Sequence, residues 1–260
     1  MNAIIQQFAD KGQGSIHLDL SFKPGIALLT IDNSSRHNAL SGKMMVEFYN
    51  AIKHIERNTH DLVALVAMGA GSTSFCAGLD LRFASDFIKT PQDILALNQL
   101  MHESIDRLAR LPLVTVAVVT GGAIGGGSEL LVGFDFVCMS KQTGFVHFVQ
   151  TRMGVSSPWG GMRRLLQIVG RKKALQWMAG GYRLEANACF EAGLVDILAE
   201  TDQTSLAQTL LFLKPFLINS NRKVSYEAVR GMKKLVTRQD KTNDWHYEND
   251  VFSSTVFSKL

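Results

Sequence analysis

The segment at residues 121–135, GGAIGGGSELLVGFD, places six glycines around one glutamate, Glu129. The strand-forming run LVTVAVVT precedes it, and a helical pattern begins near Ser128. A strand that passes through bare backbone into a helix leaves unpaired N–H groups at the positive end of the helix dipole. Such groups bind anions. The chemistry predicted here is the holding of a negatively charged oxygen by backbone donors.

Other uses of this glycine-rich segment are disfavoured by its spacing. It has neither the Lys-Ser/Thr ending of a P-loop nor GxGxxG spacing. The sequence GGSEL lacks the last glycine of the GxSxG nucleophile elbow. A close-packed turn would explain one glycine cluster, but a second small-residue loop, SFCAGLDL at 74–81, also follows a strand-like run. Two such loops favour an oxyanion hole, which requires two converging N–H groups and an unobstructed approach.

Five segments of the chain resemble the crotonase, or enoyl-CoA hydratase/isomerase, family. In family order they are SSRHNALS near residue 36, SFCAGLDL at 74–81, GGAIGGGSELLVGFD at 121–135, MGVSSPWGGMRRLLQIVG at 153–170 and EANACFEAGLVD at 185–196. The resemblance implies an α/β fold, a crotonase-like spiral of β-β-α units with a helical C-terminal trimerisation region. It also implies an acyl-CoA thioester substrate whose enolate is stabilised in an oxyanion hole, with no cofactor beyond the coenzyme A of the substrate.

The same resemblance assigns roles to individual residues. The backbone N–H groups of Leu79 and Gly126 would form the oxyanion hole, and Glu129 would be the catalytic carboxylate. The residues expected along the CoA and the substrate are Arg36, Ala39, Ala77, Gly78, Asp80, Leu81, Gln150 and Trp159. Two of these expectations have simpler alternatives, because Glu129 could instead accept from backbone N–H groups at the helix start and Trp159 could pack in the core.

The reaction depends on Gln150, which stands where hydratases of this family carry a second glutamate. An amide exchanges no proton at neutral pH, so hydration by two carboxylates is disfavoured. Closer resemblance, through FVQTRMG and SPWGG among other segments, is to members that decarboxylate short 2-alkylmalonyl-CoA thioesters such as ethylmalonyl-CoA or methylmalonyl-CoA. Decarboxylation is therefore the first hypothesis. An enoyl-CoA isomerase or hydratase working with Glu129 alone is the second, and a non-catalytic CoA- or RNA-binding protein is the third.

The elements that must position these residues alternate between strand-like and helical patterns. Strands are predicted at 15–22, 25–32, 61–71, 113–120 and 135–140, and helices at 41–58, at 92–111 and from 162 onward. No strand pattern is found after residue 206. Residues 1–200 are therefore expected to form the spiral core with the CoA and active sites, and residues 201–260 a helical C-terminal region.

Composition limits the other classes of function. The net charge is +4 with dispersed basic residues, so no nucleic-acid partner is expected, and residues 163, 164 and 171–173 are interpreted as a solvated helix face. The three cysteines and the histidines lack metal-ligand spacing, so no metal site is expected. The uncharged run 111–128 contains six Gly or Pro residues and predicts a buried strand rather than a membrane span.

The last three residues, Ser258, Lys259 and Leu260, form a peroxisomal import signal in a eukaryote. The predicted location is therefore the peroxisomal matrix for a eukaryotic source, and the cytoplasm otherwise. The partners implied by the resemblance are an acyl-CoA thioester and further copies of the chain, as a homotrimer or as a hexamer built from two trimers. No membrane partner is expected.

Overall fold

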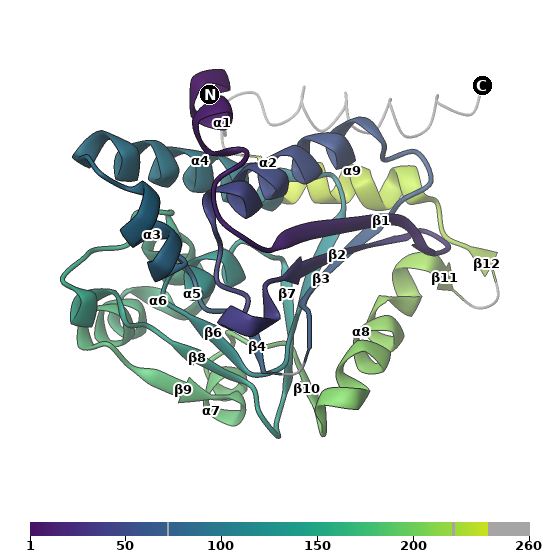
Figure 1. Cartoon of the computed structure of the whole chain (residues 1–260). Helices are drawn as coiled ribbons and strands as arrows, with labels where there is room; N and C mark the ends of the chain where they lie inside the picture. Colours follow the sequence, from purple (N-terminus) through teal and green to yellow (C-terminus); the bar gives the residue numbers. More distant parts are fainter. Residues whose placement is uncertain (72, 220–221, 239–260) are drawn as a thin grey trace.

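The computed structural model describes residues 1–71, 73–219 and 222–238. Its largest sheet has the strand order β1-β2-β3-β5-β7-β10 (Figure 1). These strands are β1 (Ser15–Lys23), β2 (Ile26–Asp32), β3 (Ala64–Gly69), β5 (Val114–Val119), β7 (Phe136–Ser140) and β10 (Ile197–Ala199). The first two form an antiparallel hairpin, whose Pro-Gly turn uses the φ of +78° at Gly25, and all later neighbours are parallel.

Alternation along each strand sends side chains to two separate apolar layers. In β3, Leu65 and Ala67 face the layer that also contains α2 (Gly42–Arg57) and α4 (Pro91–Arg110). The alternate residues face the layer that contains α8 (Asp202–Leu217) and the start of α9 (Tyr226–Val236). Parallel strands covered on both faces are continuously apolar, which explains why the runs at 61–71 and 113–120 could be predicted.

A second sheet, in the order β4-β6-β8-β9, lies beside the first. Its strands are β4 (Ser74–Cys76), β6 (Gly122–Ile124), β8 (Phe145–His147) and β9 (Arg183–Glu185). The chain therefore passes repeatedly through one strand of each sheet and then a helix, in the turns β3-β4-α3 (Leu81–Phe87), β5-β6-α5 (Gly126–Leu131) and β7-β8-α6 (Gly161–Gly180). This arrangement confirms the predicted spiral of β-β-α units.

Helix boundaries follow local capping. The Ser41 side chain accepts from the Met44 N–H at the start of α2, and Thr90 and Asp93 form a capping box at the start of α4. Helix α5 begins at Gly126, two residues earlier than predicted, because Gly125 adopts a φ of +54° before it. The remaining elements are α1 (Asn2–Phe8), η1 (Ser34–Arg36), η2 (Gln150–Met153) and α7 (Ala186–Glu191).

Two sequence predictions differ from the structure. Residues 74–76 and 122–124 were expected within loops but are strands, since strands of three residues are too short to show a period of two. The region after residue 206 was predicted to lack strands, but β11 (Ile218–Asn219) and β12 (Arg222–Lys223) form a minimal antiparallel pair between α8 and α9. In both cases the partner strand, rather than local sequence, determines the conformation.

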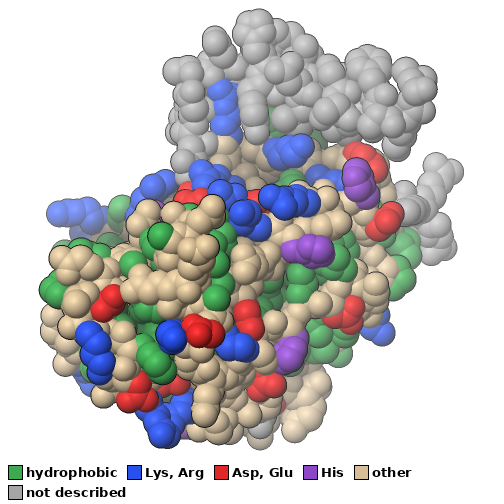
Figure 2. Space-filling model, turned by 45° about the horizontal axis from the view of Figure 1, so that its top comes forward, with side chains coloured by type: hydrophobic (Ala, Val, Ile, Leu, Met, Phe, Trp, Pro, Cys, Tyr) green, Lys and Arg blue, Asp and Glu red, His purple; other side chains and the backbone are tan. Residues whose placement is uncertain are grey.

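Apart from β11 and β12, the elements of the described C-terminal part are helices, and α8 packs directly on the large sheet through Leu213. The division at residue 200 and the trimerisation role of 201–260 stay predictions, and Ser258, Lys259 and Leu260 lie outside the described residues. None of the described helices is long and apolar enough to cross a membrane. Lys and Arg side chains form a band across the upper part of the face in Figure 2.

Candidate active site

Four predicted site residues occupy equivalent positions in successive turns of the spiral, between a strand and the helix that follows it. Ala39 follows β2 and precedes α2, and Leu79 follows β4 and precedes α3. Gly126 follows β6 at the start of α5, and Gln150 follows β8 before α6. Because neighbouring turns pair strand to strand, equivalent positions lie next to one another. The spiral therefore brings together residues that are widely separated along the chain.

Pairing between the first two of these turns orients the backbone of Leu79. The Leu40 N–H donates to the Gly78 carbonyl at 2.7 Å, and the Asp80 N–H donates to the Leu40 carbonyl at 3.0 Å. In such a parallel bridge the N–H of the central residue points away from the partner strand. No acceptor for the Leu79 N–H is found among the described residues. This predicted donor is therefore directed toward the next turn and is available to a ligand.

Glycines bring the backbone of the next turn into close contact. A Cβ on Gly78 would lie 2.7 Å from the Gly126 nitrogen, and a Cβ on Gly127 would lie 1.9 Å from the Cys76 carbonyl oxygen. Gly78 also has a φ of +82°. The Gly126 N–H is the first of α5 and has no acceptor in the described part of the chain. The two predicted donors thus lie on adjacent turns with no side chain between these backbones.

Asn38, which the sequence analysis did not single out, joins the first turn to the second. Its side chain is fully buried, accepts from the Asn33 N–H at 3.0 Å and donates to the Ala70 and Ser74 carbonyls at 3.0 and 2.7 Å. Its φ is +57°, a conformation that asparagine tolerates better than most residues. The signal in the sequence was an Asn at a turn between a strand and a helix start.

Cys76 lies beside the predicted oxyanion hole but is not equipped as a nucleophile. Its side chain is buried, and burial raises the pKa of the thiol to about 12, although the Gly78 N–H donates to the sulfur at 3.4 Å. A thiol with this pKa stays protonated near neutral pH, and the thiolate is the reactive form. The site therefore offers backbone donors rather than a cysteine nucleophile.

The carboxylate of Glu129 is buried and accepts hydrogen bonds from a loop thirty residues further along the chain. Its Oε2 accepts from Ser157 Oγ at 2.6 Å, from the Trp159 N–H at 2.9 Å and from the Gly161 N–H at 3.1 Å. Its Oε1 accepts from Gln150 Nε2 at 3.3 Å. Oε2 is thus saturated by donors, two of which are backbone N–H groups that donate only.

The hydrogen bonds of Glu129 nearly match the simpler alternative to a catalytic role, in which its carboxylate accepts from backbone N–H groups at a helix start. They differ from it in one respect. The backbone N–H groups that it accepts from belong to the start of α6, where Gly161 is the first helical residue, and not to its own helix α5. A carboxylate at a helix N-terminus stabilises that helix by hydrogen bonding and by its charge. Glu129 therefore joins α5 to the start of α6, and Oε1 is its less constrained oxygen.

The Gln150 side chain is nearly completely buried against the same network. Its Nε2 donates to the Gly125 carbonyl at 3.1 Å, with longer contacts to Ser128 Oγ and to Glu129 Oε1. Turning the amide over would point its oxygen at two acceptors, so the hydrogen-bond network fixes this orientation. Gln150 Oε1 has no partner among the described residues. Gln150 therefore interacts with Glu129 as a donor and exchanges no proton with it.

Trp159 packs against the predicted oxyanion hole, and each of its polar groups has a partner. A Cβ on Gly126 would lie 2.3 Å from its ring, its Nε1–H donates to Asn98 Oδ1 at 3.1 Å, and its carbonyl accepts from Arg164 Nη1 at 3.2 Å. The indole is 4% exposed. Its burial is that of a core residue, and its position over Gly126 is also compatible with a wall of an acyl pocket, which stays a prediction.

The residues predicted to contact CoA are only partly grouped. Arg36 and Asp80 line one pocket of about 320 Å³, where Arg36 Nε lies 3.9 Å from Asp80 Oδ2. Asp80 Oδ1 also accepts from the first N–H groups of α3, so this side chain is a helix cap. Leu81 is 64% exposed and Ala77 partly so. Basic residues at this pocket are paired with aspartates, as Arg82 is with Asp86.

Comparisons with known proteins place this geometry in context. The family model described as enoyl-CoA hydratase/isomerase matches residues 21–259. Relatives named ethylmalonyl-CoA decarboxylase include those of Rattus norvegicus, 36% identical over 90% of this chain and 74% of the relative, and Xenopus laevis, 37% identical over 95% and 80%. The relative from Homo sapiens with the same name is 36% identical over 89% of this chain and 72% of its own.

Solved structures agree with the fold. An enoyl-CoA hydratase from Bacillus anthracis superposes with a TM-score of 0.84 at 21% identity, covering 94% of this chain and 92% of that one. An enoyl-CoA hydratase from Polaromonas superposes with a TM-score of 0.79 at 24% identity, covering 95% and 93%. At these identities the likeness concerns the fold alone. The roles of the individual site residues stay predictions.

Proposed function

The chain belongs to the enoyl-CoA hydratase/isomerase family, and we propose that it decarboxylates a short 2-alkylmalonyl-CoA, such as ethylmalonyl-CoA or methylmalonyl-CoA. One observation carries this proposal. The acidic side chain of the site, Glu129, has one oxygen saturated by donors and the other facing Gln150, whereas the N–H groups of Leu79 and Gly126 have no acceptor among the described residues. Relatives named ethylmalonyl-CoA decarboxylase support the same reaction.

The reaction needs little beyond those two donors. The thioester oxygen accepts from the Leu79 and Gly126 N–H groups, with the substrate carboxylate held out of the thioester plane. The bond from C2 to the carboxylate breaks, carbon dioxide leaves, and the electron pair passes into the enolate, whose oxygen carries the new charge. A proton then adds at C2 to give the acyl-CoA. Oxyanion-hole donors of this kind each contribute about 3–4 kcal/mol to a transition state of this type.

Side chains around the hole then have supporting roles. Trp159 limits the space beside Gly126, so it bounds the 2-alkyl group of the substrate. Glu129 holds the loop that carries Trp159, through the Trp159 and Gly161 N–H groups. Gln150 donates to the Gly125 carbonyl and so fixes the turn just before the Gly126 donor. In this proposal none of these three side chains has to exchange a proton for carbon dioxide to leave.

A second candidate, double-bond isomerisation or hydration with Glu129 alone, is favoured by one contact. Glu129 Oε1 has a single hydrogen bond in the described part of the chain, at 3.3 Å from Gln150 Nε2. An oxygen held this loosely could accept a proton from a bound substrate. The third hypothesis, CoA or RNA binding without turnover, gains no such contact at the predicted CoA pocket, where Arg36 and Arg82 face Asp80 and Asp86.

The deciding experiment incubates the purified protein separately with ethylmalonyl-CoA, methylmalonyl-CoA and crotonyl-CoA and identifies the products by mass spectrometry. The expected result is loss of carbon dioxide from an alkylmalonyl thioester with crotonyl-CoA unchanged. Conversion of crotonyl-CoA to its hydroxy product, with both alkylmalonyl thioesters intact, would reject decarboxylation in favour of the second candidate. If none of the three thioesters is converted and the protein binds RNA or CoA, the third hypothesis would be selected.

Location and assembly form a further part of the proposal. A peroxisomal matrix enzyme is supported by the tripeptide Ser258-Lys259-Leu260 if the source is eukaryotic. A trimer, or a dimer of trimers, is supported by membership of the family. Both are tested directly, the first by imaging the protein with and without the tripeptide and the second by light scattering in solution.

A further inference from the structure

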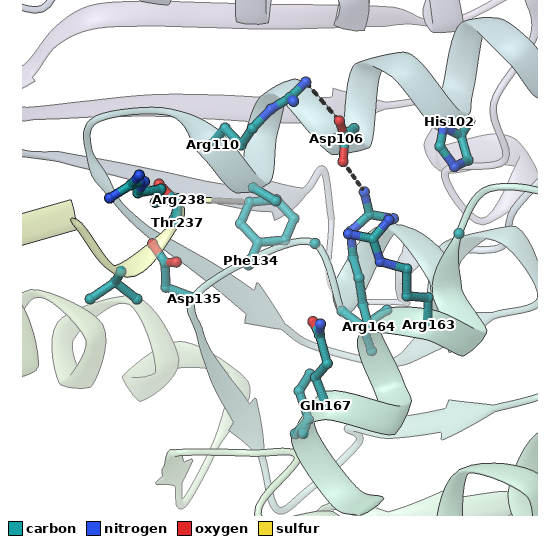
Figure 3. A pocket seen from close by; sticks show the side chains of 16 residues that line it. His102, Asp106, Arg110, Phe134, Asp135, Arg163, Arg164, Gln167, Thr237 and Arg238 are labelled. Carbon is teal, nitrogen blue, oxygen red and sulfur yellow. Dashed lines mark hydrogen bonds and ion pairs between the residues drawn. The ribbon is translucent and has the colours of Figure 1, made fainter. Parts of the chain in front are cut away.

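A pocket of about 530 Å³ lies next to the start of α6, separate from the pocket that contains Arg36 and Asp80 (Figure 3). It is formed by the end of α4, the turn between α5 and β7, the first half of α6 and the residues after α9. Gly160 and Arg164 line it, and Arg164 donates to the Trp159 carbonyl. Its volume is in the range of small-molecule sites.

Guanidinium groups outnumber the available carboxylates in this pocket. Asp106 is shared between Arg110 Nη2, at 2.6 Å, and Arg164 Nη2, at 3.2 Å. The other lining carboxylate, Asp135, pairs with Lys233. Arg163 forms no ion pair or hydrogen bond through its side chain within the described ranges. Two arginines thus divide one carboxylate, and Arg163 lies beside Arg164 without an ion pair to any residue that the structure describes (Figure 3).

Arg164 differs from the solvated helix face that its sequence predicts. Only 13% of its side chain is exposed. Burial lowers the pKa of this guanidinium, Asp106 raises it, and the neighbouring charge of Arg163 lowers it again. The single negative charge of Asp106 does not balance the positive charges of both Arg164 and its neighbour Arg163. An added anion between the two would remove that deficit.

The rest of the pocket is suited to an organic group. The buried side chains of Val132 and Phe134 form part of its wall, and Ile168 on α6 adds a partly exposed apolar side chain. Gln167 adds an amide, and Thr237 adds a hydroxyl that already donates to the Lys233 carbonyl at 2.9 Å. Inorganic phosphate alone would leave this apolar wall without a partner.

We propose that the pocket binds an organic phosphate, with the phosphate monoester at Arg163 and Arg164 and an apolar body against Phe134 and Ile168. A phosphate monoester carries close to two negative charges at neutral pH and matches the guanidinium fork in two-point hydrogen bonding. A single carboxylate would neutralise less of the surplus charge. None of the predicted catalytic residues lines this pocket, so the proposal is tested by binding and not by turnover.

The probe is phenyl phosphate, titrated calorimetrically into the wild-type protein, with benzoate and inorganic phosphate as partial mimics. Arg163→Gln is expected to weaken phenyl phosphate binding about tenfold, which corresponds to the loss of one charged hydrogen-bonding group. Arg171→Gln is the matched control, because Arg171 is an exposed arginine of α6 that lies beyond the kink at Gly170 and does not line the pocket. It should leave the affinity unchanged.

A second variant acts in the opposite direction. Asp106→Asn removes the carboxylate that competes for Arg110 and Arg164, so phenyl phosphate should bind several-fold more tightly. A variant that merely unfolds cannot produce tighter binding. Saturating CoA should leave the affinity unchanged, because none of the predicted CoA residues lines this pocket, and two of them, Arg36 and Asp80, line another.

Several outcomes would overturn the proposal. They are no binding at millimolar phenyl phosphate, equal weakening in Arg163→Gln and Arg171→Gln, and displacement of the probe by CoA. Benzoate binding as tightly as phenyl phosphate would reject recognition of a dianion. Inorganic phosphate binding as tightly would reject recognition of the apolar body.

Discussion

The two sides of the candidate site are built from different groups. On the Leu79 and Gly126 side, the contacts between neighbouring turns are made by backbone atoms, and glycine at 78 permits them. On the Glu129 side, side chains bond to one another and to the start of α6. Backbone N–H groups cannot change their protonation, whereas a carboxylate that caps a helix is already engaged. The difference supports the proposed decarboxylation, which requires stabilisation of negative charge more than proton transfer.

The largest loss of activity is expected from a substitution on the Leu79 and Gly126 side of the site. Gly78→Ala places a Cβ 2.7 Å from the Gly126 nitrogen, so one of the two donors must shift. Loss of a single oxyanion-hole donor costs about 10²–10³-fold in rate. We therefore expect kcat/KM for ethylmalonyl-CoA to fall by about that factor, measured from the release of carbon dioxide.

Gly193→Ala is the matched control for this variant. Gly193 has a φ of +78°, close to the +82° of Gly78, but a Cβ there would meet no atom within 4 Å. Both variants carry a similar backbone strain of about 1–2 kcal/mol, and only one carries the contact. Equal activity of the two variants would show that the close approach of Gly78 to Gly126 is unrelated to the reaction.

A substitution on the Glu129 side of the site should have an intermediate effect on activity. In the wild type, Glu129 Oε2 accepts from three donors and Oε1 accepts from Gln150 Nε2. Glu129→Gln replaces one of these two oxygens by an NH₂ group, so at least one donor loses its acceptor. The free energy of unfolding should fall by about 1–3 kcal/mol. Decarboxylation should fall less than about tenfold, because a general acid or base would account for about 10²–10⁴-fold. Urea unfolding and steady-state rates measure the two quantities.

Glu103→Gln provides the comparison for a carboxylate in a more solvated setting. Glu103 pairs with Arg107 within α4 and is about one-third exposed, so its loss should change stability by no more than about 0.5 kcal/mol. A hundredfold loss of activity in Glu129→Gln with unchanged stability would contradict the distinction drawn between the two sides. Glu129 would then be a proton-transfer group.

The smallest expected effect is on the pH dependence of stability and concerns His147. Its carbonyl accepts from the N–H of Gly125, the residue before Gly126, at 3.0 Å. Burial lowers the pKa of its ring, and the charges of Arg152 and Arg183 lower it further. The unfolded chain then takes up a proton at a higher pH than the folded chain. Stability from this group is present above the unfolded pKa and is lost as pH falls toward the folded pKa.

We therefore expect His147→Gln to lose less stability than the wild type between pH 7.5 and pH 5. The difference should be small, because the ring is only partly buried. Urea midpoints of both proteins at the two pH values provide the measurement. A wild-type protein that loses no more stability on acidification than the variant would contradict the expected sign.

Much of the fold could be predicted because its main elements are long and regular. The runs at 61–71 and 113–120 are apolar throughout because they lie between two apolar layers, and α4 begins at a Thr-Pro capping sequence. The second sheet could not be predicted from local pattern, since its strands of three residues include Gly122 and depend on neighbouring turns for their pairing.

The site was predictable only as far as its motifs extend. The glycines at 78 and 126 indicated close backbone approach, and the structure shows it. The partners of Glu129 could not be predicted, because Ser157 and Gly161 reach it through the packing of α6 on α5. Burial of Arg164 was missed for a related reason, since its partner Asp106 belongs to α4, outside its own helix.

The stacked turns of the spiral have a consequence for how members of such a family diverge. Each turn fixes its own loop through its own strands, so the loop that carries Gln150 is anchored separately from the loop that carries Leu79. A substitution of Gln150 would leave the Leu79 loop in place, but it would remove the hydrogen bond from Gln150 to the Gly125 carbonyl beside the Gly126 N–H. Divergence at position 150 would therefore act on the Gly126 side of the predicted oxyanion hole more than on the Leu79 side.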